Sequence, residues 1–240
     1  MRKRKVYRGD QLGRPTTKAD DRSMFFLSFH GVGEPPRSLS KSAQRHWLSI
    51  DRFQQYLDFI KERSNCRATF DDGNESDYEI VLPALRDRGL KAEFYISTSN
   101  LGREGYLTHQ QVRALADSGM VIGSHGQSHR SFRALLPRQL EQELEQSRLL
   151  LQAIVEAPVT VIALPFGDYD RRVLKQVRDA GYERVLTSDR GPARVGAWLQ
   201  SRTTVYEDDD VETFERALMC EASVLRVGIH KIKCLVKRSR

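Results

Sequence analysis

The stretch "CRATFDDGNESD", from Cys66 to Asp77, places two adjacent aspartates directly after what reads as the end of a buried strand. Successive side chains of a strand point to opposite faces, so a regular strand would not direct both Asp71 and Asp72 at one site. The backbone can turn where the strand ends, because Gly73 can adopt a positive φ there. Two carboxylates that converge on one point repel each other unless a cation lies beside them. The pair therefore predicts a cationic partner elsewhere in the chain.

The length and composition of the chain favour a single large α/β domain. Of its 240 residues, 39% are hydrophobic, which is enough to build a sizeable core. The three cysteines, Cys66, Cys220 and Cys234, are too few and too scattered for a disulfide framework, and no two have the spacing of a thiolate metal site. We therefore expect them to be buried or incidental thiols.

The formal net charge of +7 is concentrated at the two ends of the chain. Residues 1–22 carry eight basic and three acidic side chains, and residues 226–240 carry six basic and no acidic ones. We expect 1–22 to be a disordered basic arm and 223–240 to be a basic C-terminal helix or tail. Such ends can contact an anionic membrane peripherally or stay solvated, and the sequence leaves both possibilities open. No nucleic-acid partner is expected, because the chain lacks a basic folded face with interleaved aromatic residues.

The N-terminal region does not have the pattern of a secretory signal, since no apolar run follows its charged start. The first apolar run, residues 24–29, is too short to span a bilayer. From the sequence we expect a cytoplasmic protein, with membrane-peripheral contact of the basic ends as the open alternative.

Predicted strands and helices alternate from residue 24 to about residue 220. The strands are expected at 24–30, 66–70, 91–97, 120–124, 159–165 and 182–188. The helices are expected at 49–63, 75–89, 108–119, 137–155, 168–181 and 210–220, with Pro83 causing a late start or a kink in the second of them. Such alternation predicts βα units around a mainly parallel sheet.

The strongest polar signals follow the ends of the predicted strands. They are His30, Asp71 and Asp72, His125 with His129, and the triplet Pro165-Phe166-Gly167. In barrels built from βα units the chemistry lies at the C-terminal ends of the strands. We therefore expect these residues to gather at one end of such a barrel. Two other histidines, His46 and His109, adjoin predicted helix starts, and we expect both at the surface.

The motif "SHGQSH" (124–129) offers the partner that the two aspartates require. It carries two imidazoles four residues apart, and a turn of chain can bring both to one ion. One carboxylate and two histidines are a common ligand set for zinc or iron(II) with positions left open for water and substrate. The second carboxylate, beside the metal-bound water, can then act as a base. Two surface histidines on a loop are the alternative, which the neighbouring aspartates disfavour.

The motifs "TFDDG" (69–73), "SHGQSH" (124–129) and "LPFGDYD" (164–170), in this order, resemble those of the polysaccharide deacetylase family, the NodB homology domain of carbohydrate esterase type. The flanking segments 81–97 and 107–125 are similar to the same family, so the resemblance extends over about residues 24–220. It implies a distorted (β/α)7 barrel, similar to a TIM barrel, as a catalytic domain over 23–222. It also implies a metal-dependent hydrolase that removes N-acetyl, sometimes O-acetyl, groups from a carbohydrate.

Carried over by motif, the resemblance implies a role for each strand-end residue. Asp71 would be the general base, while Asp72, His125 and His129 would hold one divalent metal ion. The ion expected is Zn²⁺, with Co²⁺, Mn²⁺, Ni²⁺ or Fe²⁺ as alternatives. The triplet 165–167 would form the wall of the sugar groove, and the Phe166 backbone N–H would help to hold the oxyanion.

The sequence departs from the family pattern at two positions. Many members carry an arginine two residues before the proline of the triplet, where it braces the base, and here that position is Ala163. Many members also place the acid histidine in a late motif, and the late histidine here, His230, lies in the basic tail. In circularly permuted members this histidine is on an N-terminal strand, and "FLSFHGVG" (26–33) is similar to that pattern. We therefore expect His30 to be the general acid, with a buried structural histidine as the alternative.

Three functional hypotheses follow from the sequence. The first is a deacetylase whose partner is an acetylated carbohydrate, in polysaccharide metabolism. The second keeps the metal site but acts on a small non-sugar amide or an ester, since a fold does not determine its substrate. The third is a catalytically silent glycan-binding protein of the same fold. The glycan, the native metal and the oligomeric state are not determined by the sequence.

Overall fold

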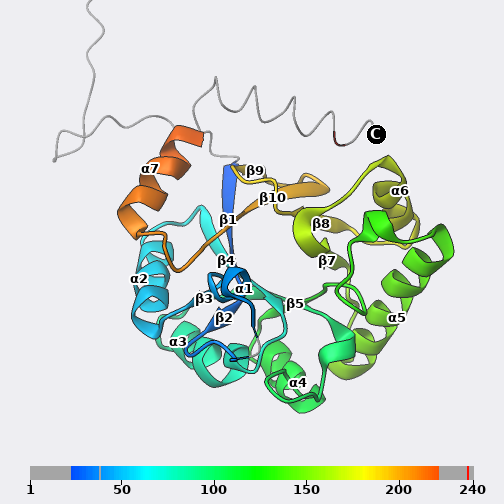
Figure 1. Ribbon diagram of the computed structural model, residues 1–240, viewed down its shortest axis with the longest axis horizontal. Helices are drawn as coiled ribbons and strands as arrows, with labels where there is room; N and C mark the ends of the chain where they lie inside the picture. Colours follow the sequence, from blue (N-terminus) through cyan, green and yellow to red (C-terminus); the bar gives the residue numbers. More distant parts are fainter. Residues whose placement is uncertain (1–22, 38, 222–236, 238–240) are drawn as a thin grey trace, which may run out of the picture.

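A closed barrel of parallel strands forms the centre of the protein (Figure 1), as seen in a computed structural model that describes residues 23–37, 39–221 and 237. Its strands are β1 (Ser23–Phe29), β4 (Cys66–Asp72), β5 (Ala92–Ile96), β6 (Val121–Ser124), β7 (Val161–Ala163), β8 (Arg184–Thr187) and β10 (Leu199–Thr204). They are arranged in the order β10-β8-β7-β6-β5-β4-β1, and β10 pairs with β1 to close the ring. The predicted (β/α)7 barrel is thereby confirmed.

Helices surround the barrel on the outside (Figure 1). They are α2 (Ile50–Lys61), α3 (Leu82–Asp87), α4 (His109–Asp117), α5 (Pro137–Val155), α6 (Arg171–Asp179) and α7 (Val211–Glu221). The largest core cluster lies between these helices and the strands, where side chains such as Leu57, Phe70, Val112 and Leu151 are fully buried. The helices therefore exclude water from the outer face of the barrel. The end of the barrel formed by the C-terminal ends of the strands stays available for polar groups.

A short excursion follows β1 before the first full helix. It contains β2 (Gly31–Val32), α1 (Lys41–Gln44) and β3 (Trp47–Leu48), and β2 pairs with β3. The ring of Trp47 packs against Gly31 so closely that an added Cβ at Gly31 would lie 2.1 Å from it. Gly31 thus allows the excursion to fold back over the end of β1, next to His30.

The observed helix ends agree with the chemistry of their capping residues. The Thr108 side chain accepts from the Gln111 backbone N–H, and the Gln111 side chain accepts from the Thr108 N–H, which forms the capping box of α4. Gly119, with φ of 75°, follows the end of that helix. Helix α5 spans the predicted residues 137–155.

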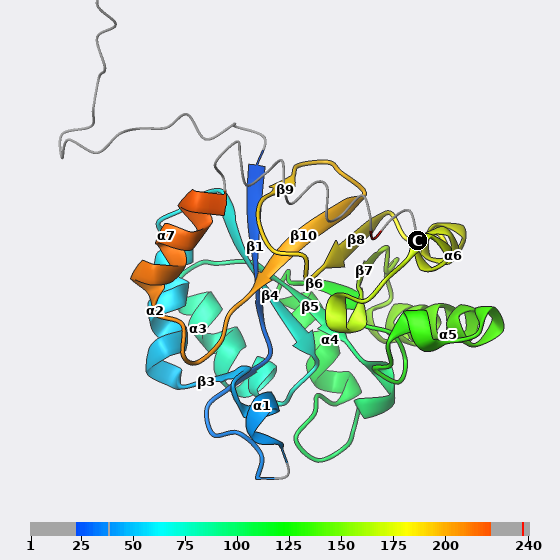
Figure 2. The same cartoon turned by 45° about the horizontal axis from the view of Figure 1, so that its top comes forward.

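The late start or kink expected at Pro83 is observed, and one strand was missed. The predicted helix 75–89 begins as a π-helical turn, η1 (Asp77–Val81), and continues as α3. Pro83 lies in the first turn of α3, and because it has no N–H and its ring crowds the preceding turn, the regular α-helical bonding is interrupted there. In addition, no strand was expected at residues 199–204, which form β10; β10 and the short antiparallel β9 (Ala193–Arg194) both pair with β1 and lie on the same side of it (Figure 2).

Some sequence predictions concern residues outside the described ranges. They are the basic arm 1–22 and, apart from Lys237, the tail 223–240, including His230. Among the described helices, none is both long enough and apolar enough to cross a membrane.

Candidate active site

The turn after β4 explains how two adjacent aspartates can approach one point. Asp72 and Gly73 both adopt left-handed backbone conformations, with φ of 75° and 77°. This ends the alternation of the strand, so the Asp71 and Asp72 carboxylates lie on the same side. Asp71 Oδ2 is 4.0 Å and Asp72 Oδ1 is 3.7 Å from His125 Nε2. A non-glycine residue such as Asp72 is strained in this conformation, and such strain is typical of functional sites.

Asp72, His125 and His129 form a cluster that could hold a metal ion. One potential ligand atom from each residue lies within 4.8 Å of the others. His129 Nε2 is 3.2 Å from Asp72 Oδ1, and this buried oxygen has no hydrogen-bond partner within the described residues. A buried carboxylate oxygen without a donor is costly unless a cation occupies the space beside it. The donor set of one carboxylate and two imidazoles fits a divalent transition metal.

His125 is held in the orientation and charge state that ligation requires. Its Nδ1 lies 2.8 Å from the Ala163 carbonyl oxygen, so Nδ1 donates and Nε2 presents its lone pair toward Asp72. Burial lowers the pKa of His125 to about 4, against the opposing charge of Asp71. The imidazole is therefore neutral at physiological pH, as a ligand must be.

Glu143 of α5 supports the loop that carries the two histidines. Its Oε2 accepts from the backbone N–H groups of Gln127 at 2.7 Å and Ser128 at 2.9 Å, and its Oε1 accepts from the Ser128 hydroxyl. Its carboxylate is almost fully buried. Sequence reasoning missed this residue, although an acidic side chain between Leu140 and Leu144 on the apolar face of an amphipathic helix was a signal.

Asp71 is paired with an arginine that the sequence analysis did not identify. Arg202 of β10 donates from Nη1 to Asp71 Oδ1 at 2.6 Å and from Nη2 to Asp71 Oδ2 at 2.8 Å. Both side chains are almost completely buried, and the Ser28 hydroxyl donates to the same carboxylate at 3.2 Å. The alanine at position 163 therefore does not leave the carboxylate without a brace, because the arginine comes from a different strand.

The Asp71 carboxylate is kept ionised by these neighbours. Burial alone would raise the pKa of Asp71, but the positive charge of Arg202 and its hydrogen bonds, together with His125, lower it below the usual range. Arg202 contacts Asp71 and not Asp72, so the two adjacent carboxylates have different surroundings. One is committed to an ion pair, and the other has a free oxygen among imidazoles.

His30 lies at the end of β1, near the two aspartates. Its imidazole interacts electrostatically with Asp71, Asp72 and His125, and burial lowers its pKa. The rings of His30 and His46 are 4.6 Å apart, edge to face, and Nδ1 of each is buried without a hydrogen-bond partner in the described structure. His46 is thus half-buried behind His30, contrary to the expected surface position, whereas His109 is exposed as expected.

The triplet Pro165–Gly167 forms a single 3₁₀ turn, η4, after β7. Phe166 is left-handed, with φ of 59°, and its side chain is 66% exposed. Its ring centroid is 4.6 Å from that of His129, so the exposed ring borders the metal-ligand cluster. Lys237 reaches this turn by donating to the Gly167 carbonyl at 2.9 Å, and it also pairs with Asp189 Oδ1 at 2.8 Å.

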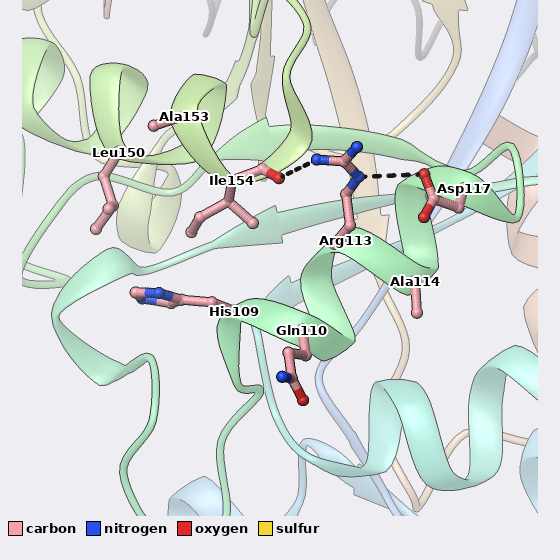
Figure 3. Close-up of a pocket in the computed structure, with 8 residues that line it drawn as sticks. All are labelled: His109, Gln110, Arg113, Ala114, Asp117, Leu150, Ala153 and Ile154. Atoms are coloured by element: carbon pink, nitrogen blue, oxygen red, sulfur yellow. Dashed lines mark hydrogen bonds and ion pairs between the residues drawn. The ribbon is translucent and has the colours of Figure 1, made fainter.

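A groove of about 510 Å³ between α4 and α5 lies apart from these residues (Figure 3). Arg113 crosses it and donates to the Ile154 carbonyl and to Asp117. The groove is lined equally by aliphatic and by polar or charged residues, and it contains none of the clustered aspartates and histidines. The groove is therefore separate from the cluster at the strand ends.

Comparison with known families places most of this site in a recognised segment. The sequence profile of the family described as "Polysaccharide deacetylase" matches residues 61–185. This segment contains Asp71, Asp72, His125, His129 and the triplet at 165–167. It does not contain His30 or Arg202, which the barrel brings to the same place.

Two curated relatives come from Bacillus subtilis (strain 168). YxkH, provisionally assigned as a polysaccharide deacetylase, is 31% identical over 125 residues, covering 52% of this chain and 45% of its own. PdaA, a peptidoglycan-N-acetylmuramic acid deacetylase, is 25% identical over 162 residues, covering 65% of this chain and 58% of its own. The chain thus spans about half the length of the curated relatives it matches.

Solved structures support the fold. The Streptococcus pyogenes deacetylase PplD, determined with acetate, superimposes with a TM-score of 0.72 at 19% identity. The match covers 82% of this chain and 98% of PplD. At this level of identity the likeness concerns the barrel architecture alone.

Proposed function

The chain belongs to the polysaccharide deacetylase family, and from this premise we propose that it is a metal-dependent hydrolase that removes acetyl groups from a carbohydrate. One observation carries the proposal: the two adjacent carboxylates are differentiated. Arg202 forms a bidentate pair with Asp71, while Asp72 keeps a buried oxygen free beside two imidazoles. A base and a metal ligand need these two different environments.

In the proposed site, Asp72, His125 and His129 would hold one divalent ion, for which Zn²⁺ is the first candidate by donor type. The ion supplies a Lewis acid and lowers the pKa of water. Asp71, ionised and 4.0 Å from the metal-facing nitrogen of His125, accepts the proton of the attacking water. Because Arg202 bonds both oxygens of the Asp71 carboxylate, it fixes the direction of the lone pairs that remain free on those oxygens. The guanidinium stays positively charged throughout the proposed reaction.

The other strand ends complete the proposed reaction. His30, on the side of the site formed by β1, gives a proton to the departing nitrogen, because an amine anion is too poor a leaving group. The backbone N–H of Phe166 would stabilise the developing oxyanion, and the exposed ring of Phe166 would form a wall for the sugar. These proposals give Asp71, His30 and Phe166 separate roles, while Asp72, His125 and His129 share the binding of the ion.

The acetyl linkage in the substrate is proposed to be an amide, since His30, which interacts electrostatically with both aspartates, could supply the proton that a departing nitrogen needs. A second candidate, O-acetyl hydrolysis, is favoured by one observation: burial lowers the pKa of His30, and an alkoxide needs less help from an acid than an amine does. The name of PdaA specifies N-acetylmuramic acid in peptidoglycan, which makes acetylated cell-wall sugars the first substrates to test.

The test is acetate release by protein that has been stripped with a chelator and reloaded with Zn²⁺, Co²⁺, Mn²⁺ or Ni²⁺. Substrates would include N-acetylated and O-acetylated glycans and a small N-acetyl amide. We expect release from a glycan only after metal is restored. Binding of glycan without release, in every metal, would instead support the silent glycan-binding hypothesis.

The division of roles is tested by two adjacent substitutions. Asp71→Asn should abolish turnover and retain one equivalent of metal, whereas Asp72→Asn should weaken metal binding as well. Metal content by elemental analysis distinguishes the two. Asp117→Asn, at an exposed position on α4, is the matched control and should change neither property. Equal loss of metal in both site variants would contradict the assignment.

A further inference from the structure

The guanidinium of Arg202 is held on its face as well as on its edge. Its Nη atoms donate to Asp71, and Nη1 also lies 3.2 Å from the Thr69 hydroxyl. Its Nε has no hydrogen-bond partner in the described residues. The Arg202 Cζ instead lies over the ring of Tyr95, 5.3 Å from the ring centroid. Hydrogen bonds alone leave the guanidinium free to tilt about the carboxylate, so the ring face supplies the remaining constraint.

Tyr95 of β5 is itself anchored inside the barrel. Its side chain is fully buried, and its hydroxyl donates to Glu93 Oε2 at 2.5 Å. Glu93, nearly fully buried, accepts two hydrogen bonds from Arg184 of β8, at 3.0 Å and 2.9 Å. The interior of the barrel thus contains two ion pairs, Arg184–Glu93 and Arg202–Asp71. Tyr95 connects them, with its hydroxyl on one pair and its ring under the other.

The surrounding residues leave the Tyr95 ring little freedom to move. A Cβ added to Gly123 of β6 would meet the ring at 2.5 Å, so the ring packs directly on the β6 backbone. Ala163 of β7 belongs to the same buried cluster as Tyr95. An alanine there, where a longer side chain would enter the barrel, leaves room for the ring and for an arginine arriving from β10. The ring is therefore a fixed surface on which Arg202 rests.

We propose that Tyr95, anchored by Glu93 and Arg184, is a positioning residue that sets the orientation of Arg202 and, through it, of the Asp71 carboxylate. This inference rests on the proposed function, in which Asp71 accepts the proton of the attacking water. A misplacement of about 1 Å in such a group can lower a rate by about 10²-fold. The contribution of Tyr95 is orientation, so it should affect turnover more than substrate binding.

The test compares two substitutions in the zinc-loaded protein. Tyr95→Phe keeps the ring and removes the hydroxyl, whereas Tyr95→Leu keeps apolar bulk and removes the ring. With an N-acetylated glycan that the wild type hydrolyses, we expect Tyr95→Leu to lower kcat about 10- to 100-fold with KM and zinc content unchanged. Tyr95→Phe loses the bond to Glu93 but keeps the ring packed on Gly123 and beneath the guanidinium, so it should lower kcat by no more than about threefold.

Tyr182 provides a matched control. It is also a buried tyrosine with an arginine, Arg148, over its ring at 5.6 Å and a hydroxyl bonded to the Leu144 carbonyl, but it belongs to a different core cluster. Tyr182→Leu should destabilise the protein without a selective loss of kcat. If Tyr182→Leu and Tyr95→Leu lower kcat alike at equal thermal stability, the positioning role is overturned.

A second measurement does not depend on turnover. The Arg202 guanidinium N–H signals in ¹⁵N NMR should be protected from solvent exchange by their bonds to Asp71. We expect this protection to be lost in Tyr95→Leu and kept in Tyr95→Phe and Tyr182→Leu. Retained protection in Tyr95→Leu would refute the inference. A wild type that is inactive on every acetylated substrate, but shows this pattern, would refute the proposed function and leave the positioning of Arg202 by Tyr95 supported.

Discussion

At the scale of single residues, the site depends on pairs that lie far apart in the sequence. Asp71 and Arg202 are 131 positions apart, and both are buried, so each neutralises a charge that the barrel interior could not otherwise accommodate. The adjacent Asp72 has no such partner within the described structure. Two identical side chains, joined by one peptide bond, are thereby given different chemistry.

Replacing Arg202 by alanine should therefore be strongly destabilising. It leaves the Asp71 carboxylate buried without a counter-charge, for which a loss of about 3–5 kcal/mol in the free energy of unfolding is expected. The double variant Asp71→Leu/Arg202→Met, which removes both charges and keeps the volume, should recover much of that loss and have no activity. Urea unfolding of the three proteins measures this. A loss below about 1 kcal/mol in Arg202→Ala would mean that the pair is not essential to the fold.

The lowered pKa values of His125 and His30 predict that turnover is fastest in an acidic pH range. His125 must be neutral to bind metal, and its pKa of about 4 allows this above that pH. Asp71, with its pKa below the usual range, is ionised there too. His30 must be protonated to act as an acid, and burial lowers its pKa from the ordinary value of 6.5, so kcat/KM on an N-acetyl substrate should fall as pH rises through this lowered pKa. A pH profile that is flat from 5 to 8 would contradict this expectation.

A comparison of two substrates distinguishes an acid role of His30 from a purely structural one. His30→Ala should lower amide hydrolysis by roughly 10²–10⁴-fold, with metal retained, since this is the usual contribution of a positioned acid. It should cost much less on an activated acetate ester, whose leaving group needs no proton. Equal losses on the two substrates would reject the acid role.

At the scale of elements, sequence reasoning succeeded where a strand is apolar and ended by a motif, and failed at β10. The segment "LQSRTT" (199–204) has an arginine and two threonines where a buried strand is expected to be apolar. The buried position of Arg202 is explained by its partner Asp71, which only the folded barrel brings beside it. Six strands were predicted, whereas the resemblance implied seven. This difference was the available sign that one strand had been missed. Glu143 and Tyr95 were likewise hidden, because their partners are backbone amides and buried charges.

Lys237 gives a prediction about the turn that carries Phe166. Besides its bonds to Gly167 and Asp189, it lies over the ring of Tyr169, 4.7 Å from the centroid, and so bridges the segments that follow β7 and β8. Lys237→Ala should loosen this turn and lower kcat/KM by about tenfold, equivalent to about 1.4 kcal/mol, mainly through a higher KM for the glycan. Lys175→Ala, which breaks an exposed pair with Asp179 on α6, is the control and should have no effect.

At the scale of the whole molecule, the alternation of strands and helices predicted βα units and a mainly parallel sheet, and the family resemblance implied a barrel, but neither indicated how the barrel closes. Closure depends on the pairing of β1 with β10, in a register that places Arg202 opposite Phe26. Non-local pairing of this kind has no signature in a local pattern. Asp71, Asp72, His125 and His129 lie close together because the C-terminal ends of neighbouring parallel strands meet at one end of a barrel.

Shortening the chain tests this closure. A chain that ends at Arg190 lacks β10, so β1 and β8 lose their pairing with it and keep only β4 and β7 as neighbours, and Asp71 loses Arg202. We expect it to lack a cooperative thermal transition and to aggregate through the exposed edges. A chain that ends at Glu221 keeps all seven barrel strands and should unfold cooperatively. Cooperative unfolding of the shorter chain, with a similar midpoint, would show that β10 is dispensable.

The late position of β10 also bears on how the protein is made. On the ribosome, the strand that carries Asp71 emerges well before the arginine that neutralises it. At ordinary rates of translation the intervening 131 residues take on the order of ten seconds to synthesise. During that interval the nascent chain has a strand-end carboxylate with no counter-charge and an open sheet edge. The barrel can therefore close, and the Asp71 carboxylate can be buried as an ion pair, only after β10 has been synthesised.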